Sequence, residues 1–205
     1  GEWHSHELEA GMEYFVLEHD RRLPANGANL AFPQRMLRGY RYAEQQEMVY
    51  VKKGSRLNPG CMIENPLLLV GAELRAVVSR MVPNIGNKSV IVMDLERQGQ
   101  FFYDWMDVQE VPCLAPERTV TENGRVSKMW VDPWALQDAA IFQIPYYRSR
   151  VLVVRVDIAE GLLRKSLYGL SVRRIELVQP CAGGACRYSG GAAAEKLVWA
   201  ECETN

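Results

Sequence analysis

The segment that most constrains the fold is residues 151–177, whose sequence is VLVVRVDIAEGLLRKSLYGLSVRRIEL. Residues 151–156 form a near-continuous run of β-branched and aliphatic side chains, typical of a strand covered on both faces. Asp157 stands at an expected helix N-cap, and Glu160 completes an Asp-x-x-Glu capping box. Gly169 follows the helix, where a positive φ is often required. The segment therefore predicts a strand, a helix and a second strand, and says almost nothing about chemistry.

The composition is that of an ordinary globular protein. Of 205 residues, 48% are hydrophobic and 24% charged, which is enough apolar material for a sizeable core. We expect a single domain over residues 12–205, or that domain with a small N-terminal lobe at residues 12–60. Residues 1–11 are expected to be a tag remnant or a disordered N-terminus. The net charge of -1 argues against a dedicated nucleic-acid binder, which usually carries a basic surplus.

The sequence predicts a reduced, cytoplasmic protein that is not associated with a membrane. Five cysteines are an odd number, unlike the pairs of a secreted disulfide scaffold. No stretch approaches the roughly 20 apolar residues that are needed to span a bilayer. The N-terminal residues are charged and lack the apolar region of a signal peptide.

The rest of the pattern predicts further strands, and one more long helix. That helix is expected at residues 67–82, with Asn65 as its N-cap and Pro66 at its first position. We expect a hairpin with Gly99 in its turn, and a long loop at residues 20–34. The expected strands are residues 13–18, 48–52, 89–95, 100–105, 125–131, 141–144 and 197–201, with a short helical turn at 132–140. Together these elements predict an α+β fold, in which a largely antiparallel sheet is covered on one face by a few helices.

The sequence contains no recognised catalytic constellation. It has no nucleotide-binding glycine loop, no Gly-x-Ser-x-Gly and no His-Glu-x-x-His motif. Cys181 and Cys186 have no second pair of ligands nearby, so we interpret them as thiols in a flexible linker at residues 180–191. A disulfide between them on oxidation and a metal site are the alternatives. We expect no catalytic residue, no metal site and no cofactor. The enzyme alternative is an unrecognised site around Asp104, Asp107 and Cys113, in which Asp104 and Asp107 form a general-acid or metal-binding pair.

Two groups of arginine and tyrosine are the candidate partner-binding residues. Both residue types are enriched at protein–protein hot spots, and both can stack on nucleic-acid bases. Because the net charge is near zero, a protein partner ranks above RNA, and an ordinary solvated face ranks above either partner. The first group is Arg35, Arg38, Tyr40, Arg41 and Tyr42, and the second is Tyr146, Tyr147, Arg148 and Arg150.

Residues 101–177 carry a series of short motifs after an aromatic strand. They are VPCL at 111–114, NGRV at 123–126, MWVD at 129–132, IFQI at 141–144 and the strand–helix–LYGL stretch at 156–170. In these motifs the chain resembles a family of bacterial immunity proteins of polymorphic-toxin systems, formerly classed as a domain of unknown function. The resemblance implies a small cytoplasmic antitoxin-like protein that neutralises a cognate protein toxin by contact, without a catalytic group. An enzyme and a nucleic-acid-associated module remain the alternatives.

Overall fold

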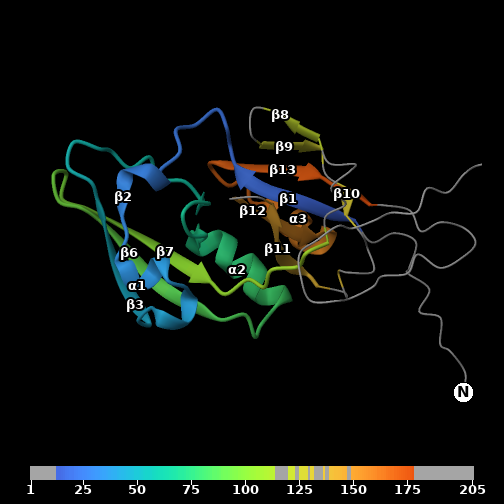
Figure 1. Ribbon diagram of the computed structural model, residues 1–205, viewed down its shortest axis with the longest axis horizontal. Coiled ribbons are helices and arrows are strands. Elements are labelled where there is room, and N and C mark those ends of the chain that lie inside the picture. The colour runs from blue at the N-terminus through green and yellow to red at the C-terminus, as the bar shows by residue number, and fades with distance from the viewer. Residues whose placement is uncertain are drawn as a thin grey trace, which may run out of the picture.

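The computed structural model describes residues 13–113, 120–122, 125–128, 130–131, 136, 139–146 and 149–177. Its strands form one sheet of four strands (sheet A), one of six (sheet B) and two small sheets of two strands. In the view of Figure 1, sheet B lies to the left of sheet A. Pairing is mostly antiparallel and the described residues contain three α-helices, so the predicted α+β class is confirmed.

Sheet A contains the strand–helix–strand segment that the sequence predicts. In spatial order its strands are β11 (Ile141–Tyr146), β12 (Ser149–Arg155), β1 (Tyr14–His19) and β13 (Leu170–Arg174). Every neighbouring pair is antiparallel. Because β12 and β13 are both antiparallel to β1, they run parallel to each other, and helix α3 (Val156–Leu163) connects them. The result is a split β-α-β unit with β1 inserted between its two strands.

Strand β12 is buried on both faces, as the sequence predicts. Leu152, Val153 and Val154 are consecutive and all nearly inaccessible to solvent. Leu152 and Val154 belong to the core between sheet A and the helices, whereas Val153 belongs to a second core on the opposite face. Each such side chain stabilises the fold by about 1.5–3 kcal/mol when fully buried.

The predicted capping box of α3 is wrong. The helix begins at Val156 with Arg155 as its N-cap, so Asp157 lies inside the first turn. The Asp157 carboxylate accepts hydrogen bonds from the Arg155 guanidinium, at 3.0 and 2.7 Å, and from its neighbour's N–H. Glu160 lies 3.8 Å from Arg164 in an ion pair instead of reaching back to the N-cap. The prediction for Gly169 is confirmed, since its φ is +83°.

Sheet B is built around a long hairpin. Its spatial order is β2 (Leu30–Ala31), β3 (Gln46–Val51), β6 (Asn87–Asp94), β7 (Gly99–Met106), β5 (Leu69–Val70) and β4 (Met62–Ile63). The β3–β6 pair is parallel, and the other pairs in this sheet are antiparallel. The β6–β7 hairpin is confirmed, but Gly99 is the first residue of β7, and Gln98 has the positive φ of the turn, +53°.

The second long helix starts later than the sequence predicts. Helix α2 spans Ala72–Met81 with Gly71 as its N-cap, so Asn65 and Pro66 do not lie at its start. Leu69 and Val70 instead form β5 and pair with β7. Both are fully buried, one in each of the cores that flank sheet B, so apolar residues occur on both faces of this short strand. Such an uninterrupted apolar run cannot be distinguished from a helix by its periodicity.

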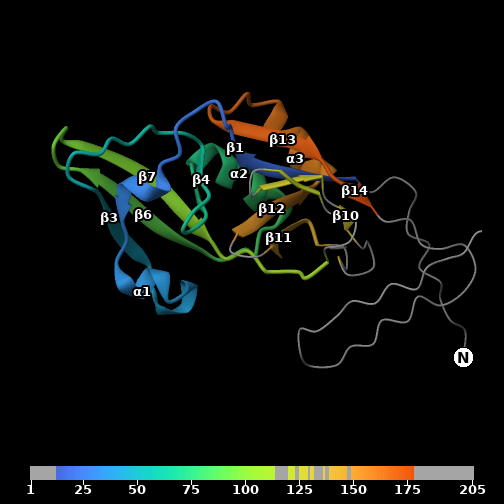
Figure 2. The ribbon, with the colours of Figure 1, turned by 45° about the horizontal axis from the view of Figure 1, so that its top comes forward.

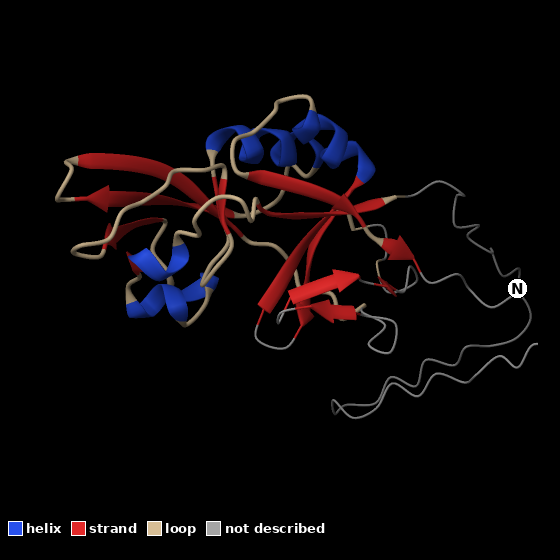
Figure 3. Cartoon of the chain, turned by 90° about the horizontal axis from the view of Figure 1, so that it is seen from above, coloured by secondary structure: helices blue, strands red, loops and turns tan. Residues whose placement is uncertain are grey.

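Helices α2 and α3 pack against each other and against one face of sheet A. Their buried side chains share one core with Leu17, Leu152 and Val154 of sheet A and with Met106 of β7. The helices approach closely at Gly161, where an added Cβ would lie 2.9 Å from the Cγ1 of Val77. Figure 3 shows that α2 and α3 do not cover the long strands of sheet B at the end that lies away from sheet A.

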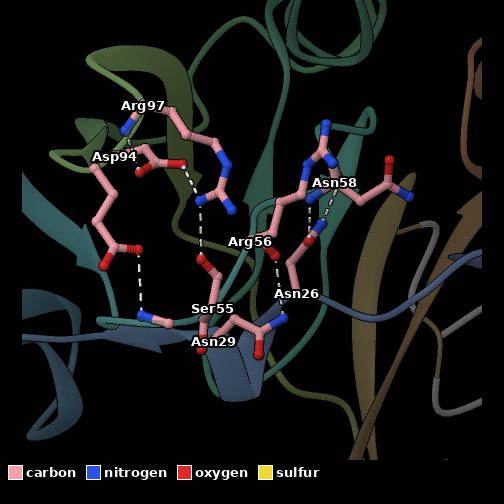
Figure 4. A network of polar contacts seen from close by, with 9 residues as sticks. Asn26, Asn29, Ser55, Arg56, Asn58, Asp94 and Arg97 are labelled. Carbon is pink, nitrogen blue, oxygen red and sulfur yellow. Dashed lines mark hydrogen bonds and ion pairs between the residues drawn. The ribbon is translucent and has the colours of Figure 1, made fainter.

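The predicted loop at residues 20–34 is bonded to residues 52–58, and these in turn contact the tip of the β6–β7 hairpin (Figure 4). Figure 2 shows the same part of the molecule turned by 45° from Figure 1. It contains a 3₁₀ turn, η1 (Gly27–Asn29), strand β2 and the first residue of α1 (Gln34–Leu37). The buried Asn26 side chain donates to Asn58 O at 2.6 Å and accepts from Asn58 N–H at 2.8 Å. Arg97 of the hairpin donates to Ser55 O at 3.1 Å. Side-chain bonds to backbone groups therefore hold these irregular segments in place.

The remaining predictions are tested only in part. The predicted strand at residues 125–131 is seen as β9 (Arg125–Lys128), paired with β8 (Val120–Glu122), and as β10 (Trp130–Val131), paired with β14 (Glu176–Leu177). Several predictions lie outside the described residues: residues 1–11, most of the helical turn at 132–140, the linker with Cys181 and Cys186, and the strand at 197–201.

Candidate interaction surface

Arg35, the first residue of the candidate arginine–tyrosine group, forms an ion pair within the fold. Its guanidinium donates to both carboxylate oxygens of Glu47, at 2.6 and 2.7 Å. The Glu47 side chain is completely buried, and it also accepts the N–H of Glu44. The hydrogen bonds from Arg35 lower the pKa of Glu47, because they favour the charged carboxylate. Arg35 therefore joins α1 to β3.

Tyr40 is also largely structural. Its ring packs edge-on against Trp105, with centroids 5.3 Å apart. Lys88 lies over the same ring and donates to the carbonyl oxygens of Tyr40 and Ala43, at 2.6 and 2.8 Å. Burial raises the pKa of the Tyr40 hydroxyl. These contacts fix η2 (Tyr40–Tyr42) against sheet B.

The other members of this group lie on the surface. The guanidinium carbons of Arg38 and Arg41 each lie 4.6 Å from the centroid of the Tyr42 ring. Arg41 also donates to the Tyr42 hydroxyl. All three side chains are exposed or partly exposed, so this stack is available for contact with a partner. The stack is a candidate contact patch, because arginine and tyrosine are both enriched at protein–protein interfaces.

The second predicted group does not join the first. It lies at the β11–β12 connection of sheet A, whereas the first lies against sheet B. Tyr147 and Arg148 lie outside the described residues, and only the backbone of Tyr146 is described. Arg150 forms an ion pair with Glu110. The described members of the two groups therefore belong to different sheets.

The residues of the enzyme alternative do not converge. The Asp104 carboxylate lies 3.0 Å from the Arg75 guanidinium and accepts a hydrogen bond from Asn87. Asp107 is exposed just beyond β7, and Cys113 is buried in the core on the far face of sheet A. Within the ranges that the structure describes, no three His, Cys, Asp or Glu side chains are grouped so that they could hold a metal ion.

The structure shows an apolar surface that sequence reasoning missed, on the part of one face of sheet B that helix α2 leaves uncovered. The register places Met48 of β3, Ile91 of β6 and Phe102 of β7 in one row across the sheet. Tyr50 and Met93 lie in the next row, where the Tyr50 hydroxyl contacts the Met48 sulfur at 3.1 Å. We call these five residues the open face. Met48, Tyr50 and Phe102 remain 45%, 41% and 68% exposed.

The opposite face of the same strands is fully covered. Val49, Val90, Val92 and Tyr103 pack there against Leu30, Met36 and Leu57, in a core that also contains Trp105. Alternating side chains point to opposite faces of a strand, so both faces of β3 are apolar by sequence. Apolar residues on both faces predict a strand, but they do not predict which face of the sheet remains exposed to solvent.

The comparisons with protein families and with curated proteins give no relative. No protein-family model matches the chain, and no curated protein is similar to it. Within the described residues, no helix combines the length and the apolar character that crossing a membrane requires.

Proposed function

We propose that this chain is a non-enzymatic binding protein that contacts a protein partner through the open face. The supporting observation is that Met48, Tyr50 and Phe102 stay exposed on adjacent strands in register. Single exposed apolar side chains are common on monomers, whereas contiguous apolar patches mark interaction sites.

The residue types of the open face suit a protein partner. Aromatic residues and methionine are enriched in protein interfaces. Each aromatic side chain buries about 150–250 Å² when it is covered, and apolar burial stabilises by about 25 cal/mol per Å². Phe102, the most exposed of the five, and Tyr50 are therefore the expected hot-spot residues. The Arg38–Arg41–Tyr42 stack is a second candidate contact patch.

The resemblance over residues 101–177 extends the proposal to the kind of partner. On that basis the chain is an immunity-like protein that neutralises a cognate toxin in the cytoplasm by covering it. Phe102 and the other residues of β7 from Phe101 onward fall within this region. The absence of a shared site for Asp104, Asp107 and Cys113 supports a contact mechanism over the enzyme alternative.

Site-specific photo-crosslinking tests this proposal. A photoreactive phenylalanine analogue is placed at Phe102 or Tyr50 in the full chain, which is expressed in its natural host. Leu163, 58% exposed on α3, is the matched control position, because it is apolar and lies outside the open face. We expect one protein to crosslink from both open-face positions and not from Leu163. Crosslinks at Leu163 alone, or at none of the three positions, would contradict the proposal.

A further inference from the structure

Strand β7 has an open edge beside the open face. Strand β6 pairs with all of β7, whereas β5 pairs only with Asp104 and Trp105. After Val70 the chain turns away at Gly71, whose N–H donates to Cys61 O at 2.7 Å before α2 begins. Within the described part of the chain, no strand therefore lies beside residues 99–103 on this side.

The register fixes which backbone groups face this edge. Asp107 N–H donates to Gly86 O, so Asp107 faces β6. The backbone N–H and C=O groups of residues two apart along a strand point toward the same neighbouring strand. Those of Phe101 therefore point toward β6, and those of Gln100 and Phe102 point away from β6, toward the open edge. Among the residues that the structure describes, none makes a hydrogen bond to the backbone of Gln100 or Phe102 from the open side.

A groove of about 410 Å³ lies along this edge. It is lined by residues 100–103 of β7, by residues 59–61, by Leu167 and Tyr168, and by Glu73 of α2. The Tyr103 hydroxyl donates to Gly60 O at 3.0 Å, which ties the 59–61 segment to β7. The groove therefore offers apolar and aromatic walls next to unpaired strand positions.

Glu73 is the one charged residue that lines the groove. Its side chain is exposed, and it forms no ion pair with any residue that the structure describes. Burial, and to a smaller extent the Glu73 charge, raise the pKa of the Cys61 thiol in the groove to about 11. The negative charge of Glu73 is thus felt inside the groove, where it favours a cationic occupant.

We propose that the groove binds an extended, basic peptide segment of the protein partner, which adds to the open edge of β7 as a strand. This inference rests on the proposed function and specifies how the partner is held. The outward N–H and C=O groups of Gln100 and Phe102 supply a ladder for such a strand. Edge strands with unpaired backbone groups are templates for this kind of pairing.

The side-chain preferences of the segment follow from the sheet geometry. Directly opposite residues point to the same face, so the residue opposite Phe102 lies on the Phe102 side. Helix α2 lies on that side too, because its Arg75 pairs with Asp104, two residues along the strand. A lysine or arginine at this position packs its aliphatic stem on Phe102 and directs its charge toward Glu73.

A library of displayed linear peptides, selected on the full-length chain, tests this inference. The best peptide is synthesised, and its affinity is measured by fluorescence anisotropy for the wild type, Gln100→Pro and Gln100→Ala. Proline is tolerated in a strand where the N–H points away from the sheet, so Gln100→Pro removes an edge donor and spares the β6 ladder. We expect about a tenfold loss of affinity for Gln100→Pro and little change for Gln100→Ala.

Two further measurements keep the test decisive. Hydrogen exchange on the wild type is expected to show that the peptide protects the amides of Gln100 and Phe102, whether or not the proline variant folds. Selection on Glu73→Gln is expected to lose the preference for lysine or arginine. No enriched peptide, or equal affinity for Gln100→Pro and the wild type, overturns strand addition. The proposed function is tested independently, by the crosslinking experiment at Phe102 and Tyr50.

Discussion

Arg35 and Glu47 form a bidentate ion pair in which the Glu47 side chain is fully buried and the Arg35 side chain is half exposed. The pair joins α1 to β3, on the face of sheet B opposite the open face. A buried carboxylate requires such partners, because leaving it unpaired in the interior is costly. Arg35 is therefore expected to contribute to stability, and not to partner binding.

Replacing Glu47 with glutamine is expected to destabilise the protein. The variant loses the charged acceptor for two hydrogen bonds from Arg35 and one from Glu44. Hydrogen bonds to charged groups contribute about 1.5–3 kcal/mol, so we expect the free energy of unfolding in urea to fall by about that amount. Glu160→Gln is the control, because its ion pair with Arg164 is exposed, and we expect no measurable change. Equal effects of the two variants would contradict this account.

The same pair predicts a pH dependence. The pKa of Glu47 is lowered below its ordinary value of 4.5 in the folded state. The stabilisation is therefore complete above the unfolded-state pKa, and is lost as pH falls through the folded-state pKa. Unfolding of the wild type at a series of pH values between about 5 and 2 is expected to show this loss. The free energy of unfolding of Glu47→Gln is expected to fall less than that of the wild type over this pH range. The same pH dependence in both proteins would contradict this prediction.

The close helix contact predicts that Gly161→Ala is destabilising. Alanine normally favours a helix over glycine by about 0.5–1 kcal/mol. At Gly161, however, the new Cβ would lie 2.9 Å from Val77 Cγ1, so overpacking is expected to produce a net loss of about 1–2 kcal/mol. A double-mutant cycle with Val77→Ala checks the cause by thermal or urea unfolding. The account requires Gly161→Ala to cost less in the Val77→Ala background than in the wild type.

Adjacent residues of β7 are expected to respond in opposite ways. Phe102→Asp changes a side chain on the open face, so its free energy of unfolding is expected to stay within about 0.5 kcal/mol of the wild type. Tyr103→Ala removes a buried ring and its hydrogen bond to Gly60, and a loss of about 3–5 kcal/mol is expected. Both are measured by urea unfolding. A large loss for Phe102→Asp would mean that the open face is covered.

Local sequence signals predicted much of the fold. The consecutive apolar residues of β12, the β6–β7 hairpin and the positive φ of Gly169 all follow from side-chain shape and turn chemistry. The predictions are wrong where a contact with another part of the structure determines the local conformation. Leu69 and Val70 form a strand because β7 lies beside them, and Arg155 takes the Asp157 carboxylate that the sequence assigned to the helix N-cap.

The candidate site was much harder to predict from the sequence. In the sequence Arg35 and Tyr40 look like surface residues. The partner of Arg35, Glu47, lies on another element, and the partner of Tyr40, Trp105, lies far along the chain. The open face could not be identified, because Met48 and Val49 are both apolar and only the packed structure decides which is covered. Burial depends on tertiary contacts that no local pattern contains.

The most direct test of the central claim compares two exposed apolar positions. Phe102→Asp and Leu163→Asp each add one charge to an exposed site, the first on the open face and the second on α3. The affinity of the protein captured by crosslinking is measured for both variants by titration calorimetry, after urea unfolding has shown that both are folded. The account predicts that Phe102→Asp weakens binding by at least about tenfold, and that Leu163→Asp binds as the wild type does. Unchanged binding by Phe102→Asp would contradict it.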